Sequence, residues 1–320
     1  MQRVHIVVEL DPPREPDLNR YLDAARRLQA AGVDAITIAD NALAQSRVAA
    51  LAASFLLKER LDMPVIVHIS ARDRNLLAQQ STIFGLYAQG VRDLLIVSGD
   101  SMKVGDHPTG KGVFETDSLG LMERVKRLRA GVDFFDRPLK EPVHLRFGGA
   151  LNLRKQHDVM LKRLMKKYEC GAEYFFSQPV YDEESMKNIA TIRDNETFPT
   201  SLPVYLGLMP IISYDNARFI QTIPGVHLSQ SVVESFQSLT GDDARQFGVQ
   251  HACTLAKIAY SRYGFRHFYF VTPYLRASLT AALTVCLRTY AEEHSREKHR
   301  PIIDQTHDKT VLINHERRPG

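Results

Sequence analysis

Polar side chains stand where several apolar, β-branched runs of the sequence end. Glu9 closes the first run, His68 lies near the end of the third, and Ser98-Gly99-Asp100 follows the fourth. The fifth run leads into Gly148–Asn152 and the sixth into Gln178. If these runs are parallel strands, their carboxyl ends meet on one face, which then holds two carboxylates, an imidazole and an amide. Such a set suits proton transfer and recognition of a polar heterocycle.

Each of these residues also has an ordinary structural explanation. A glutamate at a strand end is often a rim residue, and a single histidine such as His68 is more often a satisfied structural residue than a ligand. Asp100 follows a glycine and suits a helix N-cap or a turn. Gln178 precedes a proline and can satisfy backbone groups. The functional interpretation therefore depends on their joint occurrence at one end of the predicted sheet.

The elements that must position these side chains alternate between strands and helices. Several predicted helices stop at a glycine that leads directly into the next strand, namely Gly32, Gly90 and Gly171, as in short αβ loops. Eight such units without a polar linker predict a single α/β domain, a closed (β/α)8 TIM-type barrel. The predicted strands are Val4–Glu9, Val33–Ala39, Pro64–Ile69, Asp93–Val97, Val143–Phe147, Glu173–Ser177, Val204–Leu208 and Phe265–Val271.

An open, doubly wound sheet is the competing architecture. That fold usually carries a glycine-rich first βα turn that holds a pyrophosphate, whereas the turn here is Leu10-Asp11-Pro12-Pro13. A length of 320 residues, with 44% hydrophobic residues, also fits one barrel. We therefore expect the barrel to occupy residues 1–291.

The segment 292–320 differs in character from the barrel. It is charged and holds four of the 12 histidines, at irregular spacing and without acidic or cysteine partners arranged around them. We predict a solvated tail or an arm that docks on a partner, and no metal site.

Composition excludes several classes of protein. A net charge of +4 and the absence of tryptophan give no support to nucleic-acid binding. The apolar runs are too short for a membrane span, and the N-terminus lacks a signal pattern, so we expect a cytoplasmic protein. Three cysteines, Cys170, Cys253 and Cys286, without any CxxC motif exclude a disulfide framework and disfavour structural zinc.

Two segments imitate known ligand motifs. Gly105–Gly112 (GDHPTGKG) resembles a phosphate-binding P-loop, but Gly112 stands where the Ser or Thr belongs and Pro108 removes an amide donor. The basic run Lys162–Lys167 lies on one amphipathic helix, which indicates a solvated face or a lysine that reaches a phosphate. Neither segment predicts an NTPase or a nucleic-acid protein.

The strand ends together resemble those of methylenetetrahydrofolate reductases, most closely the reductase half of the bacterial bifunctional homocysteine S-methyltransferase/methylenetetrahydrofolate reductase. The similarity extends in order from residue 4 to about 290. The matching segments are Val7–Pro13, Asp34–Asn41, His68 with Arg72–Asn75, Ser98–Asp100 with Lys103–Asp106, Cys170–Ala172 with Ser177–Pro179, Gly207–Pro210 and Thr272–Arg276.

The resemblance implies an FAD-containing barrel in which NADH or NADPH reduces the flavin and methylenetetrahydrofolate is then reduced to methyltetrahydrofolate. Glu9 matches the family's general acid, and Asp100 the aspartate that contacts both folate and flavin. Gln178 matches the amide that reads the pterin, Tyr214 an aromatic ring against the p-aminobenzoyl group or the nicotinamide, and Arg276 a substrate-side arginine.

The residues that the resemblance assigns to FAD come mostly from strand ends, and Lys167 is the expected partner of a phosphate. The set is His68, Ser98, Gly99, Asp100, Phe114, Ala150, Asn152 and Lys167. The chain departs from the family in three places. Leu10-Asp11 replaces two phenylalanines, Ser98 stands where many members have arginine, and Ala39 stands where many have threonine.

A second hypothesis is a non-redox folate-binding barrel that serves a methyltransferase or corrinoid partner, with the charged tail as docking arm. A homo-oligomer is compatible with either hypothesis. Folate binding without oxidation of NADH or NADPH would favour the second one.

Overall fold

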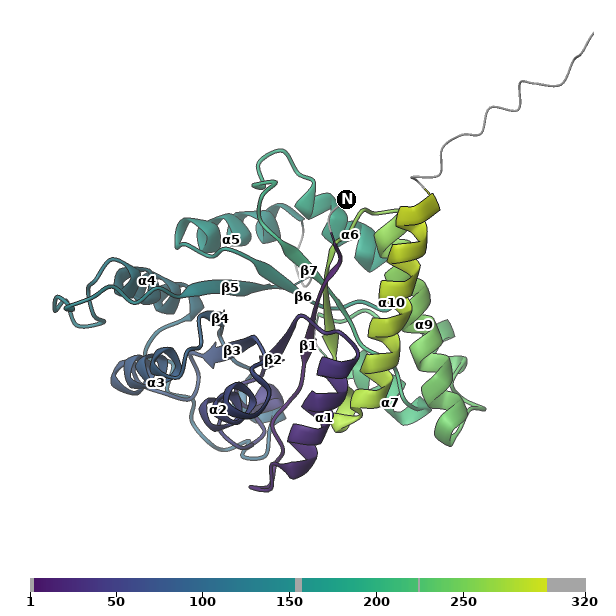
Figure 1. Cartoon of the computed structure of the whole chain (residues 1–320), viewed down its shortest axis with the longest axis horizontal. Coiled ribbons are helices and arrows are strands. Elements are labelled where there is room, and N and C mark those ends of the chain that lie inside the picture. The colour runs from purple at the N-terminus through teal and green to yellow at the C-terminus, as the bar shows by residue number, and fades with distance from the viewer. Residues whose placement is uncertain (1–2, 153–156, 224, 298–320) are drawn as a thin grey trace, which may run out of the picture.

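The computed structural model describes residues 3–152, 157–223 and 225–297. Their eight strands are all parallel, each pairs with the next along the chain, and β8 pairs with β1. The barrel is therefore closed, which confirms the predicted TIM-type fold and excludes the open sheet (Figure 1). The strands are β1 His5–Glu9, β2 Ala35–Ile38, β3 Val65–Ser70, β4 Asp93–Val97, β5 Arg146–Leu151, β6 Phe175–Pro179, β7 Val204–Leu208 and β8 His267–Val271.

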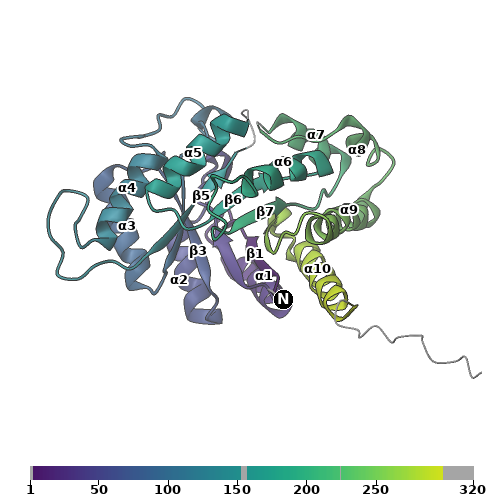
Figure 2. The same cartoon turned by 90° about the horizontal axis from the view of Figure 1, so that it is seen from above.

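Helices surround the strands, and α9 and α10 lie side by side (Figures 1 and 2). The described α-helices are α1 Asn19–Ala30, α2 Ala50–Leu61, α3 Leu76–Ala88, α4 Ser118–Arg129, α5 His157–Glu169, α6 Glu183–Arg193, α7 Tyr214–Thr222, α8 Gln230–Glu234, α9 Gly241–Ser261 and α10 Ala277–Glu297. Three short 3-10 helices are η1 Ala42–Ala44, η2 Met102–Val104 and η3 Pro273–Leu275. Among the described residues, no helix combines the length and the apolar character that a membrane span requires.

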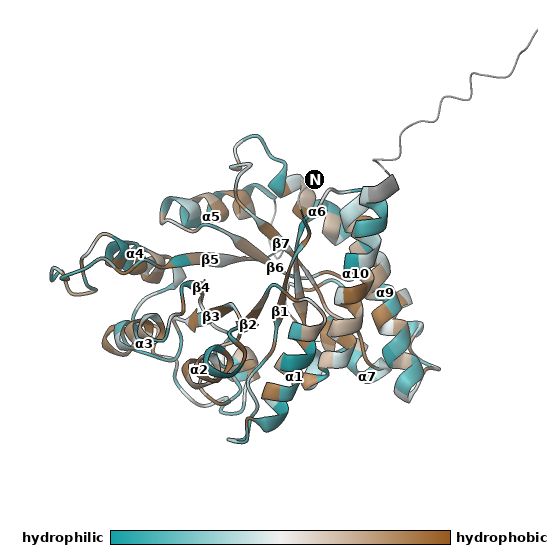
Figure 3. Ribbon diagram, in the orientation of Figure 1, coloured by the Kyte–Doolittle hydropathy of each residue, from teal (hydrophilic) through white to brown (hydrophobic). Residues whose placement is uncertain are grey.

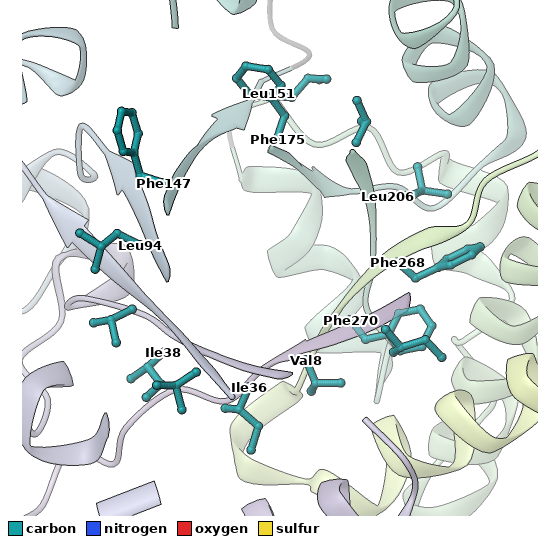
Figure 4. Packing of buried hydrophobic residues seen from close by; sticks show 14 of the residues in the cluster. Val8, Ile36, Ile38, Leu94, Phe147, Leu151, Phe175, Leu206, Phe268 and Phe270 are labelled. Atoms are coloured by element: carbon teal, nitrogen blue, oxygen red, sulfur yellow. The ribbon is translucent and has the colours of Figure 1, made fainter. Parts of the chain in front are cut away.

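Alternation along the strands divides the core into two layers. Side chains such as Val8, Ile36 and Phe270 point away from the space that the strands enclose and pack under the helices (Figure 4). The ribbon coloured by hydropathy shows hydrophobic residues along the strands, while the helices carry both hydrophobic and hydrophilic residues (Figure 3). Full burial of a side chain of this kind contributes about 1.5–3 kcal/mol. The opposite side chains, among them Val7 and Tyr269, form a smaller cluster inside the barrel. Glu9 follows Val7 at strand spacing and so continues the inward-facing row at the mouth.

The fifth strand begins later than the sequence analysis predicted. Val143–Phe147 was the expected run, but β5 spans Arg146–Leu151 and pairs with β4 from Arg146 onward. Its interior contains Gly148 and Gly149, where a Cβ would overlap Tyr174 and press on Met122 and Lys167. These two glycines look like a loop in sequence, yet close packing of neighbouring side chains requires them within the strand.

The predicted glycine stops are confirmed at the ends of three helices. Gly32, Gly90 and Gly171 have φ of +81°, +82° and +98°, which lets the chain turn into the next strand without a side-chain clash. At the other end of the domain, α10 continues to Glu297, so the predicted boundary at 291 falls inside a helix. The remainder of the predicted tail, 298–320, lies outside the described residues.

Two of the three cysteines are paired. Cys253 on α9 and Cys286 on α10 form a disulfide with a Cα–Cα distance of 6.4 Å, while Cys170 is free and buried. Cysteine count and spacing gave no sign of this single cross-link, because the two residues meet only through the packing of α9 against α10.

Candidate active site

A cavity of about 560 Å³ opens at the carboxyl ends of the strands. Polar residues from several strand ends and from helices α4 and α5 line it, as the barrel topology requires. It brings together nine of the residues that the sequence analysis selected: Glu9, His68, Ser98, Gly99, Asp100, Ala150, Asn152, Lys167 and Gln178.

Glu9 lies at the inner end of this cavity within a compact acid cluster, which we define as Glu9, Thr37, His68 and Tyr269. The Tyr269 hydroxyl on β8 donates to Glu9 Oε2. His68 Nε2 lies 3.6 Å from the same oxygen and 2.5 Å from Thr37 Oγ1. Three strands besides β1 therefore fix the carboxyl group and its neighbours.

Burial determines the protonation of the acid cluster. The side chain of Glu9 is 12% exposed. Burial, followed by the charge of Asp11, raises its pKa to about 8, although the Tyr269 hydrogen bond and Arg47 act in the opposite direction. Burial also lowers the pKa of His68 to about 4. At neutral pH the cluster therefore holds a protonated carboxyl group beside a neutral imidazole.

Asp100 belongs to an exposed loop that other polar groups hold in place. It follows Gly99, whose φ is +87° and whose missing Cβ leaves room for Ser70. The Leu43 N–H donates to Asp100 Oδ2 at 2.8 Å. The buried Arg72 guanidinium donates to the Asp100 carbonyl at 3.1 Å, so both the side chain and the backbone of Asp100 are positioned.

Helix α5 contributes the cationic side of the cavity, which we call the α5 face and define as Arg163 and Lys167. These residues are one turn apart and both line the cavity. Lys167 Nζ donates to the Ala150 carbonyl at 2.5 Å. Burial, with a smaller effect of Arg163, lowers the pKa of Lys167 to about 8. An anionic group in the cavity would favour the charged form of this lysine.

Gln178 lines the cavity and carries an unsatisfied hydrogen-bond acceptor. It lies in β6, and its Oε1 is buried without a hydrogen-bond partner among the described residues. A buried amide oxygen without a partner is costly, and a ligand that donates a hydrogen bond would remove that cost. The arrangement fits recognition of an N–H group.

Three selected residues do not line the cavity. Phe114 lies in an exposed loop with φ of +41°, and Tyr214 is the first residue of α7, where it packs beside the cluster that contains Ile211. Arg276 follows η3 and lines a separate hollow of about 410 Å³ with three other arginines, Arg20, Arg27 and Arg245. Their assigned contacts remain predictions.

Sequence reasoning missed several side chains at this site. Tyr269 lies two residues before the end of β8, and its inward orientation becomes evident only once β8 is paired with β1. Arg163 could have been found from its spacing of four residues from Lys167 on a predicted helix. The sequence could not predict the ion pair between Asp11 and Arg47, whose side chains lie 3.4 Å apart, because the two residues belong to loops that are far apart in the chain.

No group of three or more histidine, cysteine or acidic side chains in the described part of the chain is arranged to hold a metal ion. The polar groups at the cavity are instead a protonated acid, a neutral imidazole, amides and cations. Such a donor set suits an organic, hydrogen-bonding and partly anionic ligand.

The fold and the cavity together define a TIM-type barrel with a polar cavity at the carboxyl ends of its strands. A model of the methylenetetrahydrofolate reductase family matches residues 1–287, and the chain belongs to that family.

Two individual proteins illustrate how far this relationship extends. Methylenetetrahydrofolate reductase 2 of Schizosaccharomyces pombe is 23% identical over 206 residues, which are 63% of this chain. The match covers 32% of that protein, so it spans about a third of the relative's length. A solved structure of a protein from Clostridium thermocellum, which binds two copies of 5-methyl-5,6,7,8-tetrahydrofolic acid, has a TM-score of 0.57 at 13% identity. That comparison covers 91% of this chain and 96% of the other, and it shows a common barrel fold.

Proposed function

We propose that the chain is a flavin-dependent methylenetetrahydrofolate reductase, which uses NADH or NADPH to convert 5,10-methylenetetrahydrofolate to 5-methyltetrahydrofolate. The observation that carries the proposal is a largely buried glutamate, Glu9, which lines the cavity and accepts a hydrogen bond from Tyr269, in a chain that belongs to this family. The activity and both cofactors are part of the proposal.

Glu9 acts as the general acid. The methylene bridge of the folate must open before its carbon can accept hydride, and a proton delivered to the departing nitrogen assists that opening. With a pKa of about 8, the Glu9 carboxyl group carries its proton at neutral pH. The Tyr269 hydroxyl orients it, and the neutral imidazole of His68 provides a polar neighbour without competing as an acid.

Asp100 acts as the complementary carboxylate. Its exposed loop leaves it accessible from the cavity, while Leu43 and Arg72 fix its direction. A negative charge at this place stabilises the cationic character that develops on the folate as the bridge opens. Two carboxyl groups in unlike surroundings thus divide the roles of acid and charge stabiliser.

The residues at the cavity fit an FAD group. Lys167 and Arg163 offer positive charge to phosphates, while Ser98, Gly99 and Asn152 offer short side chains and backbone groups along the rim. The carbonyl of Ala150 already accepts from Lys167, which fixes the ammonium group at the wall. When bound, FAD would supply the two-electron chemistry that links the nicotinamide nucleotide to the folate.

Recognition of the substrate falls to the other polar groups. The unpartnered Oε1 of Gln178 would accept from an N–H of the pterin ring. Tyr214 and Arg276 do not line the cavity, and the family resemblance alone brings them into the proposal: Tyr214 as the ring against the p-aminobenzoyl group or the nicotinamide, and Arg276 as a substrate-side arginine.

The test measures two half-reactions separately in the Glu9→Gln variant: reduction of the flavin by NADH or NADPH, and its reoxidation by methylenetetrahydrofolate. Purified protein reconstituted with FAD is reduced anaerobically by NADH or NADPH, and bleaching of the yellow flavin is followed. We expect this step to stay within about threefold of the wild-type rate, because it needs no proton from Glu9. Reoxidation by methylenetetrahydrofolate should fall about 10²- to 10⁴-fold.

The matched control is Glu15→Gln, an exposed glutamate outside the cavity, which should alter neither step. Equal loss of both half-reactions in Glu9→Gln would contradict the role of Glu9. Wild-type protein that binds methyltetrahydrofolate but never oxidises NADH or NADPH would instead favour the non-redox folate barrel.

A further inference from the structure

Arg72 is a buried charged side chain in the wall of the cavity. It is 1% exposed, so its N–H donors need partners within the protein. Nε and Nη2 donate to the two carboxylate oxygens of the adjacent Asp73, at 2.6 and 2.8 Å. Nη2 also donates to the Asn41 carbonyl at 2.9 Å, and Nη1 to the Asp100 carbonyl at 3.1 Å. One guanidinium group therefore joins the loops that follow β2, β3 and β4.

Asn41 completes a triangle of hydrogen bonds with this ion pair. Its Nδ2 donates to Asp73 Oδ2 at 3.2 Å, and its Oδ1 accepts from the Arg47 N–H at 3.2 Å. Its φ of 51° lies in the left-handed region, which asparagine tolerates better than most residues. We call Asn41, Arg72 and Asp73 the loop clamp, because hydrogen bonds join each of its three pairs.

The loop clamp holds both anchors of Asp100. The carboxylate of Asp100 accepts from the Leu43 N–H, and Leu43 lies two residues beyond Asn41 with φ of 56°. The backbone carbonyl of Asp100 accepts from Arg72 directly. Strained backbone such as that at Leu43 persists only where surrounding contacts over-determine it, and the clamp supplies such contacts. Loss of the clamp would therefore release the side chain and the backbone of Asp100 together.

The stem and the backbone of Arg72 are held as firmly as its guanidinium group. The Val113 N–H donates to the Arg72 carbonyl at 2.7 Å. A Cβ on Gly99 would lie 2.8 Å from Arg72 Cβ, and one on Gly112 would lie 3.2 Å from Arg72 Cγ. The chain on either side of Arg72 thus packs closely against it, which leaves the planar guanidinium group little freedom to reorient.

We propose that the loop clamp positions Asp100 for its part in the reaction, with Arg72 as the central positioning residue. The proposal rests on the proposed role of Asp100 as the carboxylate that stabilises positive charge on the folate. Because Asp73 balances the charge of Arg72, the clamp can fix the direction of Asp100 without adding net charge to the cavity.

A second ion pair beside the clamp provides a matched control. Arg74 donates to both oxygens of Asp40 at 2.6 and 2.8 Å, and Asp40 Oδ2 also accepts from the Ser70 N–H. Each of the two ion pairs has one fully buried member. Within the described residues, no hydrogen bond or ion pair joins Arg74 to Asp100. Arg72→Gln and Arg74→Gln therefore break comparable ion pairs, and only the first removes a contact with Asp100.

The test is a double-mutant cycle on the rate at which saturating methylenetetrahydrofolate reoxidises the reduced flavin. We expect Arg72→Gln to lower this rate about 10- to 100-fold, as for loss of a hydrogen bond from a charged group. In the Asp100→Asn background the same change should lower it less than about threefold, because the carboxylate that Arg72 positions is already absent. Arg74→Gln should change the rate by the same factor in both backgrounds.

A conservative variant separates the shape of Arg72 from its charge. Arg72→Lys keeps the charge but cannot contact Asn41, Asp73 and Asp100 at once, so its rate should stay close to that of Arg72→Gln. Should Arg72→Gln fail to fold by circular dichroism, Asp73→Asn serves in its place, with a smaller coupling to Asp100 of the same sign. Equal effects of Arg72→Gln in the two backgrounds, or a wild-type rate in Arg72→Lys, would overturn the proposal.

Hydrogen exchange of the flavin-free protein examines the clamp without any activity. Arg72→Gln should speed amide exchange in residues 41–46 and 99–106 about tenfold, whereas Arg74→Gln should leave 99–106 unchanged. Unchanged exchange in 99–106 of Arg72→Gln would also overturn the proposal. If wild-type protein exchanges as expected but folate never reoxidises its flavin, the proposed function fails while the clamp still holds the loop of Asp100.

Discussion

The acid cluster and the α5 face lie on the same cavity and differ in their access to water. Glu9 and His68 have side chains that are 12% and 9% exposed, and burial removes charge from both at neutral pH. Arg163 on the α5 face is exposed to solvent, and the exposure of Lys167 is intermediate. The barrel thus separates a largely buried acid from a more exposed cationic helix face, and the two environments suit the proton transfer and the anchoring of a charged ligand that we propose.

The largest effect that would test this difference between the acid cluster and the α5 face is on the free energy of unfolding. Because the pKa of Glu9 rises from 4.5 to about 8 on folding, unfolding releases a proton between those values, and the free energy of unfolding falls as the pH rises through that interval. Glu9→Gln removes this cost and should raise the free energy of unfolding by about 3 kcal/mol at pH 7, but by little at pH 4. Urea denaturation at both pH values measures it.

Asp100→Asn is the matched control, because it removes an exposed carboxylate from the same cavity. We expect it to show no comparable gain between pH 4 and pH 7. A Glu9→Gln protein with the same pH dependence as the wild type would show that the acid is ionised in the folded chain.

A smaller effect is expected on the α5 face. Lys167→Met removes the ammonium group proposed to pair with a phosphate and should weaken FAD binding about 10- to 100-fold, as expected for a hydrogen bond to a charged group. Fluorescence titration of the apoprotein with FAD gives the dissociation constants. Lys166→Met changes the adjacent, exposed lysine, which does not line the cavity, and should bind FAD as the wild type does. Equal affinities for both variants would remove Lys167 from the binding site.

The smallest expected effect concerns the hydrogen bond between Tyr269 and Glu9 within the acid cluster. Tyr269→Phe removes the hydroxyl that stabilises the ionised form of Glu9, so the pKa of Glu9 should rise further. In the role that we propose for Glu9, the folate half-reaction needs the protonated acid, so its rate should fall as the pH increases through that pKa. The falling limb of the pH profile should therefore move up by about one pH unit.

The comparison variant for this experiment is Tyr174→Phe. Tyr174 also lies inside the barrel, but its hydroxyl donates to the Leu94 carbonyl rather than to Glu9. We expect its pH profile to match that of the wild type. A downward shift in Tyr269→Phe would mean that the phenol stabilises the neutral carboxyl group.

Local sequence patterns predicted the repeating strand–helix units of this molecule. They did not predict features that depend on packing between distant parts of the chain. The glycine stops and apolar runs predicted the barrel, because each depends on a few adjacent residues. The start of β5 was misplaced, since Gly148 and Gly149 resemble loop residues in sequence, whereas in the barrel they pair with β4 and Tyr174 and Lys167 occupy the space that their side chains would fill. Strand ends likewise predicted Glu9 and Asp100 as site candidates. Tyr269 and Arg47 could not be predicted, because their contacts with the site arise from closure of the barrel and from one loop conformation.

The hydrogen bond between Tyr269 and Glu9 joins residues 260 positions apart in the chain. During synthesis, the acid therefore leaves the ribosome long before the phenol that orients it has been made. The surroundings that raise the pKa of Glu9 exist only in the closed ring of strands, and a chain arrested before β8 carries the glutamate without them. Such long-range closure also slows folding, so newly made chains should gain their compact helices before they gain this site.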